Sequence, residues 1–183
     1  LHRNGYEVHG VVRPFTFKNR IEWIQSLIPN IKVHEILISH YGMLTDLIKD
    51  VQPTEIYNFI SSSNVFSAWQ DTDRVLSTDG QFPQHIMECI LKIDKSIKYF
   101  QASSCLIFGR NAEGIQNENT SISPIHPYGI AKLYADNMVK EFRHVHGLFA
   151  CSGIFYNHQS PRRGDGFFSK KITPGRMNPC HGR

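Results

Sequence analysis

Short apolar segments alternate with amphipathic ones along most of the chain. Residues 6–13, YEVHGVVR, are rich in β-branched side chains and end just before Pro14, a pattern that predicts a strand. Four later segments show the same character. The predicted strands are residues 6–13, 31–38, 54–60, 96–103 and 148–156.

Between these segments, apolar residues recur every three or four positions, which predicts helices. In residues 41–51 four apolar side chains fall on one face, and Pro53 ends the pattern. The predicted helices are residues 20–28, 41–51, a long region that ends at 93 and is interrupted around Gly80 and Pro83, and 127–146. Residues 111–123 are predicted to form a polar loop.

The alternation of strands and helices predicts parallel pairing with right-handed crossovers. Because apolar strands alternate with helices, we expect helices on both faces of the sheet. The predicted fold class is therefore α/β, with a doubly wound parallel sheet of the Rossmann type. Ligands of such folds bind beyond the carboxyl ends of the strands, so the residues that follow each strand are the candidates for function.

Composition fits a soluble globular protein, since 40% of the 183 residues are hydrophobic and 20% are charged. The sequence contains no apolar run near the ~20 residues that span a bilayer, and its start does not resemble a signal peptide. The four cysteines form neither a CxxC pair nor a metal-binding spacing with histidine. We therefore expect reduced thiols, no metal, no membrane contact and a cytoplasmic location.

The formal net charge is +4, and much of it comes from residues 162–183, where six Lys or Arg residues face only Asp165. A basic tail can bind nucleic acid. No aromatic platform or nucleic-acid-binding motif accompanies this one. Basic residues also serve proteins that bind phosphorylated small molecules, and the sequence favours that interpretation.

The strongest chemical signal is Tyr128 and Lys132, which open the predicted 127–146 helix and share one of its faces. An ammonium near a phenol stabilises the phenolate, and the tyrosine then serves as an acid or base near neutral pH. Such a lysine can also hold the ribose of a nicotinamide cofactor. Among seven tyrosines this spacing can arise by chance. Its place after the fourth strand favours a catalytic pair.

Weaker candidates follow the other strands. Arg13 ends the first strand, where an arginine suits the 2′-phosphate of NADP, although a solvated arginine is equally ordinary. Ser61 and Ser63 follow the third strand and would let a cofactor lie against the backbone, or they belong to a simple polar loop. Ser104, after the fourth strand, is a candidate donor to a substrate oxygen.

The fifth strand is followed by Asn157 and His158, and then by Arg162 and Arg163. Amide and imidazole groups hydrogen-bond to amides and sugars, and paired arginines suit a pyrophosphate. The alternative is a polar turn. The clustering of these four residues after a buried strand favours a ligand site.

Six segments together resemble the GDP-mannose 4,6-dehydratase family, in the extended branch of the short-chain dehydrogenase/reductases. They are GYEVHGVVR (5–13), RIE (20–22), QPTEIYN (52–58), KYFQAS (98–103), HPYGIAKLYA (126–135) and NHQSPRRG (157–164). The resemblance covers about residues 5–172 and implies a partial NADP-binding Rossmann domain. It also implies a homo-oligomer that acts on a nucleotide sugar, GDP-mannose or a relative, without nucleic acid.

The family reaction moves a hydride from C4 of the mannose to NADP and returns it to C6, after a glutamate removes the C5 proton and water leaves C6. By resemblance, Tyr128 is the base, Lys132 tunes it and binds ribose, and Ser104 stands where the family has threonine. The other residues implied to bind ligands are Arg13, Ser61, His158 and Arg163 for the cofactor, and Ser63 and Asn157 for the substrate.

The chain departs from the family in four places. One is the end of the second strand, where the family has an acidic pattern near the adenine and this chain has Leu-Ile-Ser-His at residues 37–40. No counterpart of the family's first strand and glycine-rich loop is found, so we expect an open gap between the strands at 6–13 and 54–60. Leu106 stands where the family has the glutamate, and a leucine cannot take a proton. The resemblance fades after residue 172, where residues 173–183 are expected to be disordered and most of the substrate domain is missing.

Three functions follow from these features. The first is GDP-mannose 4,6-dehydratase activity. The second is hydride transfer without loss of water, as in related epimerases and reductases, for which Ser104, Tyr128 and Lys132 suffice. The third is a degenerate relative without catalysis, which acts through pairing with another subunit.

Overall fold

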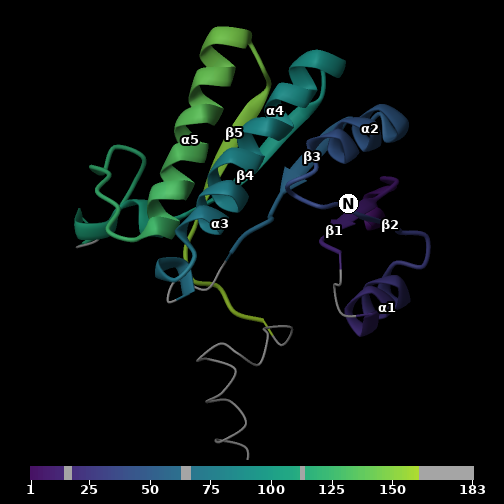
Figure 1. The fold of residues 1–183 in the computed structure, drawn as a ribbon, viewed down its shortest axis with the longest axis horizontal. Coiled ribbons are helices and arrows are strands. Elements are labelled where there is room, and N and C mark those ends of the chain that lie inside the picture. The colour runs from purple at the N-terminus through teal and green to yellow at the C-terminus, as the bar shows by residue number, and fades with distance from the viewer. Residues whose placement is uncertain (15–17, 63–66, 112–113, 161–183) are drawn as a thin grey trace, which may run out of the picture.

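The strands form two parallel sheets in the computed structural model, which describes residues 1–14, 18–62, 67–111 and 114–160 (Figure 1). β1 (His9–Val12) pairs with β2 (Lys32–Glu35). β3 (Glu55–Asn58), β4 (Lys98–Ser104) and β5 (Ala150–Phe155) form the second sheet in that order. Each of these pairings is parallel, which confirms the prediction from the alternating pattern. The predicted tail at 173–183, and its expected disorder, lie outside the described residues.

The longer helices follow the predicted pattern closely. Tyr41–Val51 forms α2 and Pro127–His146 forms α5, with the bounds predicted from sequence. α5 ends at Gly147, whose φ of 69° allows its N–H to bond back to the carbonyls of Phe142 and Arg143. The other helices are α1 (Lys18–Leu27), α3 (Thr72–Leu76) and α4 (Phe82–Ile93), with short 3-10 turns η1 (His2–Asn4), η2 (Ser67–Trp69), η4 (Cys105–Ile107) and η5 (Gly109–Asn111).

The region around Gly80 and Pro83 is not interrupted as predicted. α3 continues through a π-helical turn, η3 (Ser77–Gln81), directly into α4. The N–H of Phe82 bonds to the carbonyl of Ser77, five residues earlier, so the helix widens rather than breaks. Pro83 lies in the first turn of α4, directly after the π-helical turn.

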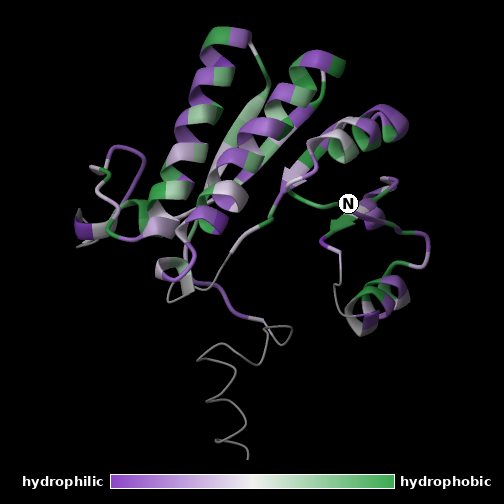
Figure 2. Ribbon diagram, viewed as in Figure 1, coloured by the Kyte–Doolittle hydropathy of each residue, from purple (hydrophilic) through white to green (hydrophobic). Residues whose placement is uncertain are grey.

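The main core lies between the β3–β4–β5 sheet and helices α2, α4 and α5. Alternate residues of β4 point into it, and Tyr99 and Gln101 are completely or almost completely buried. Figure 2 shows hydrophobic and hydrophilic residues interleaved along α4 and α5, as expected of helices with one buried face. The core also contains Met87, Ile90, Ile97, Val139, Phe142, Leu148 and Ala150.

The opposite face of this sheet carries aromatic rings instead of a helical layer within the described residues. Phe100 contacts Tyr57 and Phe59, and Phe155 packs edge-on against Phe100. Phe59 remains 61% exposed. The expectation that helices cover both faces is therefore met on one face of this sheet only.

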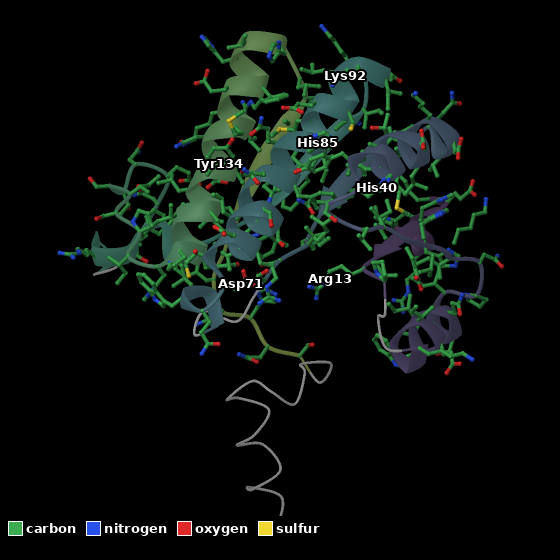
Figure 3. The ribbon with its side chains drawn as sticks, viewed as in Figure 1. Arg13, His40, Asp71, His85, Lys92 and Tyr134 are labelled. Atoms are coloured by element: carbon green, nitrogen blue, oxygen red, sulfur yellow. The ribbon has the colours of Figure 1, made fainter. Side chains whose placement is uncertain are left out.

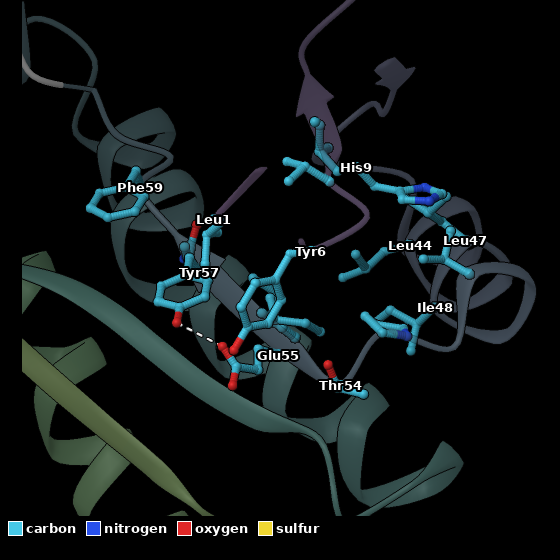
Figure 4. A pocket seen from close by; sticks show the side chains of 18 of the residues that line it. Leu1, Tyr6, His9, Leu44, Leu47, Ile48, Thr54, Glu55, Tyr57 and Phe59 are labelled. Atoms are coloured by element: carbon cyan, nitrogen blue, oxygen red, sulfur yellow. Dashed lines mark hydrogen bonds between the residues drawn. The ribbon is translucent and has the colours of Figure 1, made fainter. Parts of the chain in front are cut away.

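A cavity of about 690 Å³ separates the two sheets (Figure 4). It is lined by residues 8–11, which include most of β1, by residues 51–60, which include β3, and by apolar side chains of α2. Because β1 and β3 belong to different sheets, this is the place of the gap expected from the sequence. In the described part of the chain, no helix has the length and apolar character needed to cross a bilayer.

Candidate active site

Tyr128 and Lys132 come together at the carboxyl ends of the strands. The Lys132 side chain is 2% exposed, and its Nζ donates to the carbonyl of Ala102, near the end of β4, at 3.0 Å. The same Nζ lies 5.6 Å from the centre of the Tyr128 ring. This cation–π distance places the ammonium close to the phenol, as the i, i+4 spacing on α5 predicts.

Asp79 completes the environment of the lysine. It comes from η3, is fully buried, and its Oδ1 lies 3.2 Å from Lys132 Nζ. It also accepts hydrogen bonds from Ser61 Oγ at 2.7 Å and from the backbone N–H of Ser62 at 2.9 Å. A buried carboxylate needs such compensation. Asp79 was not among the residues predicted from the sequence.

Ser61 connects Asp79 with Tyr128. Its Oγ is 3.4 Å from the Tyr128 hydroxyl and 2.7 Å from Asp79. A hydroxyl has one hydrogen, and the shorter contact gives it to the Asp79 carboxylate, so the 3.4 Å contact of Ser61 Oγ with the Tyr128 hydroxyl is the weaker of the two. We call these four residues, Ser61, Asp79, Tyr128 and Lys132, the strand-tip site.

Two glycines allow the elements of the strand-tip site to approach. A Cβ on Gly129 would lie 2.7 Å from the carbonyl oxygen of Leu106, so the first turn of α5 can sit against η4 only without a side chain there. A Cβ on Gly80 would lie 3.2 Å from side-chain atoms of Leu76 and Tyr134. Gly80 therefore lets η3, and Asp79 with it, pack closely on α5.

Ser104 and Leu106 lie next to each other at the end of β4. Ser104 Oγ accepts from the Leu106 N–H at 3.3 Å and so caps η4. Leu106 lines a cavity of about 250 Å³ together with Cys105 and His126. Burial raises the pKa of the Cys105 thiol, which disfavours the thiolate near neutral pH. The side chain at position 106 supplies no proton acceptor to this cavity.

The remaining predicted ligand residues are not gathered into the strand-tip site by the contacts described. Arg13 follows β1 and is exposed (Figure 3). Asn157 and His158 follow β5 and are exposed, and His158 Nδ1 lies 2.9 Å from the Tyr156 carbonyl. Ser63 and Arg163 lie outside the described residues. Within the described ranges, no group of three or more His, Cys, Asp or Glu side chains is arranged to hold a metal ion.

A second buried carboxyl, Asp136, lies one turn beyond Lys132 on α5. It is 5% exposed and accepts a hydrogen bond from Ser103 Oγ at 2.7 Å. Burial raises its pKa above the ordinary value, and the bond from Ser103 opposes part of that rise. The charges of Lys140 and Lys132 also lower the pKa of Asp136, so this carboxyl is electrostatically linked to the site.

Comparisons with known proteins identify relatives of this chain. The family model described as GDP-mannose 4,6 dehydratase matches residues 1–183. The GDP-mannose 4,6-dehydratase of Vibrio cholerae is 36% identical over 188 residues, which cover 97% of this chain and 50% of the relative. The enzyme of that name from Homo sapiens is 38% identical over 183 residues, covering 94% of this chain and 49% of the relative. The chain thus spans about half the length of the curated relatives it matches.

Two solved structures share the fold at low sequence identity. The dTDP-glucose 4,6-dehydratase DesIV of Streptomyces venezuelae, with NAD and TYD bound, has a TM-score of 0.81 at 17% identity, covering 93% of this chain and 52% of that one. The UDP-glucuronic acid 4-epimerase of Bacillus cereus, in complex with UDP-glucuronic acid and NAD, has a TM-score of 0.80 at 18% identity, covering 96% and 56%. The predicted Rossmann-type α/β fold class is confirmed.

Proposed function

The chain belongs to the GDP-mannose 4,6-dehydratase family, and from that membership we propose that it carries the hydride-transfer centre of a GDP-mannose 4,6-dehydratase. The observation that supports this most is the strand-tip site. Tyr128 and Lys132 meet beside the end of β4, where ligands of parallel α/β sheets bind.

The proposed cofactor is NADP. The two solved structures compared above hold NAD, and a guanidinium after β1, that of Arg13, suits the additional 2′-phosphate. The strand-tip site fits the nicotinamide ribose, because Lys132 offers ammonium hydrogens and Ser61 a hydroxyl. When bound there, the cofactor supplies the hydride acceptor and donor. His158 and Arg163 remain proposed contacts of the same cofactor.

Tyr128 is proposed to take the proton of the sugar 4-hydroxyl as its base. Lys132 stabilises the phenolate that this role requires and holds the ribose. Ser104 Oγ accepts from the Leu106 N–H and therefore keeps its own hydrogen for a substrate oxygen. Asn157 and Ser63 are the proposed contacts of the nucleotide sugar.

Leu106 favours a second candidate, which is hydride transfer without loss of water. The family reaction needs a base for the C5 proton, and the position beside Ser104 holds a hydrocarbon side chain in the small cavity. Oxidation at C4 needs only Ser104, Tyr128 and Lys132. The two candidates therefore share the first step and differ in the elimination.

Incubation with NADP and GDP-mannose tests both candidates. NADPH absorbance reports the oxidation, and mass spectrometry reports whether the sugar loses one water. Loss of water supports the dehydratase. An oxidised or epimerised sugar of unchanged oxygen content supports the second candidate, and the Leu106→Glu variant should then gain the elimination. A chain that neither binds NADPH nor forms either product contradicts both.

Family membership also supports assembly as a homo-oligomer in the cytoplasm. Sedimentation velocity on the purified chain tests the first part. A single species at the mass of one chain, across the concentration range used for assays, contradicts it.

A further inference from the structure

The cavity of about 250 Å³ beside η4 contains a histidine that the proposed function does not use. It is lined by Cys105 and Leu106 from η4 and by His126, which directly precedes α5. Leu106 lies two residues after Ser104 in the chain. His126 lies two residues before Tyr128. Close sequence neighbours of both groups that are proposed to act on the sugar therefore form the walls of this cavity.

The His126 side chain has a polar atom that the surrounding protein leaves unpaired. Its Nδ1 is buried and has no hydrogen-bond partner among the residues that the structure describes. His126 is the N-cap residue of α5, but its side chain makes no capping hydrogen bond. A buried polar atom without a partner costs free energy. Packing and helix capping therefore do not account for a histidine at this position.

The other polar side chains that line the cavity are poorer proton acceptors. Burial raises the pKa of the Cys105 thiol, so the sulfur keeps its proton near neutral pH. The Tyr156 hydroxyl donates to Oε1 of Gln116 at 2.8 Å, and a side-chain amide does not serve as a base. Imidazole is the group that most often serves as a general base in enzymes. Among the described side chains of the lining, His126 is thus the proton acceptor.

We propose that His126 is a catalytic residue, which removes the C5 proton of the 4-keto sugar in place of the glutamate that the family has at position 106. This inference rests on the proposed function, because the C5 proton becomes acidic only after oxidation at C4.

The elimination balances with an imidazole as the base. The C5–H bond breaks, its electron pair forms the C5=C6 double bond, and the C6–O bond breaks. The proton taken up by His126 passes to the departing hydroxide, so one water leaves and the imidazole is neutral again. The hydride then returns to C6, and the Tyr128 hydroxyl gives its proton to C5. The sequence as a whole is redox-neutral.

The fold holds the segment before α5 against η4. The backbone N–H of Ser123 donates to the carbonyl of Ile107 at 3.1 Å. A Cβ at Gly129 would lie 2.7 Å from the Leu106 carbonyl oxygen, so the missing side chain permits this close approach. His126 lies between these two contacts in the chain. Its ring is therefore held beside the position where the family has its glutamate.

The test follows loss of water and deuterium incorporation at C5 in D₂O, with NADPH absorbance as a separate record of oxidation at C4. His126→Asn is a suitable variant, because asparagine is a preferred N-cap residue and preserves the start of α5. It should slow water loss and C5 exchange by about 100-fold or more, and leave single-turnover NADPH formation close to the wild-type rate. His144→Asn, at an exposed position near the end of α5, should change neither rate.

A failure of this inference can be told apart from a failure of the proposed function. A wild-type chain that forms no NADPH contradicts the proposed function, and the role of His126 falls with it. A wild-type chain that forms NADPH without water loss or C5 exchange overturns the role of His126 alone. The same conclusion follows if His126→Asn eliminates water at the wild-type rate.

A double variant separates loss of the base from damage to the fold. Leu106→Glu added to His126→Asn returns a proton acceptor to the same cavity and should restore the loss of water. A double variant that still forms NADPH but recovers no elimination would overturn the proposal. If His126→Asn does not fold, His126→Gln, which also lacks a basic nitrogen, takes its place in both comparisons.

Discussion

The two sheets of this protein differ in how deeply their side chains are buried. The β3–β4–β5 sheet buries alternate side chains of β4 beneath α4 and α5, and the strand-tip site stands at its end. No side chain of β1 or β2 is fully buried, and these strands are joined by polar contacts such as the 2.9 Å hydrogen bond between His9 and His34. The proposed chemistry therefore rests on the tightly packed half.

The two sheets would serve different parts of the bound cofactor, one the hydride transfer and the other the selection of NADP. Tyr128, Lys132 and Asp79 are held by buried contacts from several elements. Arg13, which is proposed to select NADP, follows β1 of the two-stranded sheet, on the other side of the 690 Å³ cavity. Substitutions that remove buried packing in the first half should therefore lower stability, whereas substitution of Arg13 in the second half should change mainly cofactor affinity.

The largest difference is expected from truncating side chains in each half. Met87→Ala removes a side chain that is 0% exposed and should lower the free energy of unfolding by about 2–5 kcal/mol. Val11→Ala on β1, 45% exposed, should change it by no more than about 0.5 kcal/mol. Urea unfolding measures both. Equal losses would show that the two sheets form one equally packed core.

The next effect concerns the packing contact between the first turn of α5 and η4. Gly129→Ala places a Cβ 2.7 Å from a backbone oxygen and should cost about 1–3 kcal/mol, while moving Tyr128. Gly42→Ala in α2 meets only the His40 ring at 3.7 Å and should be neutral or stabilising by up to about 1 kcal/mol. Thermal unfolding distinguishes them, and a harmless Gly129→Ala would mean that this contact does not define the site.

Arg13→Ala should weaken NADPH binding by about tenfold, the equivalent of one lost charge-assisted contact, and leave NADH binding unchanged. Fluorescence titration with each cofactor measures the two affinities. Arg74→Ala, at an exposed position on α3, is the control. Equal losses for NADPH and NADH would remove the argument for the 2′-phosphate.

The smallest predicted effect is an opposite response of the two halves to pH. Burial, followed by the charges of His9 and Lys32, lowers the pKa of His34 from 6.5, so the unfolded chain binds more protons there and the β1–β2 sheet loses stability as pH falls below that value. Burial raises the pKa of Asp136 from 3.8, so the folded chain binds more protons there and its half gains stability as pH falls toward that value.

Hydrogen exchange followed by mass spectrometry between pH 7 and 5 can separate the two responses, after correction for the intrinsic exchange rate. Protection of residues 9–12 should fall. Protection of α5 around Asp136 should hold or rise, and the Asp136→Asn variant should lose that part of the pH dependence. A parallel loss of protection in both halves would contradict the assignment of the two buried groups.

Sequence predicted the elements whose signals are local. α2 and α5 have the predicted bounds because an apolar stripe and a terminal Gly or Pro define them. β1 and β3 are shorter than predicted, at His9–Val12 and Glu55–Asn58. Pairing depends on the neighbouring strand and is invisible in the segment itself.

The site was predicted in part for the same reason. Tyr128 and Lys132 were found because their spacing lies within one helix turn. Asp79 was missed because its meaning depends on Ser61 and Lys132, which are 18 and 53 positions away in sequence, and on a π-helical turn that no local pattern announced. Ser104 was expected beside the pair, and its described contact is with Leu106.

The central claim is that Tyr128 is the base of hydride transfer at the strand tips. Single-turnover formation of NADPH from NADP and GDP-mannose, compared between wild type and Tyr128→Phe, tests it most directly. The rate should fall by about 100- to 10,000-fold, while NADPH affinity and the free energy of unfolding stay close to wild type. A Tyr128→Phe protein that forms NADPH at the wild-type rate would contradict the account.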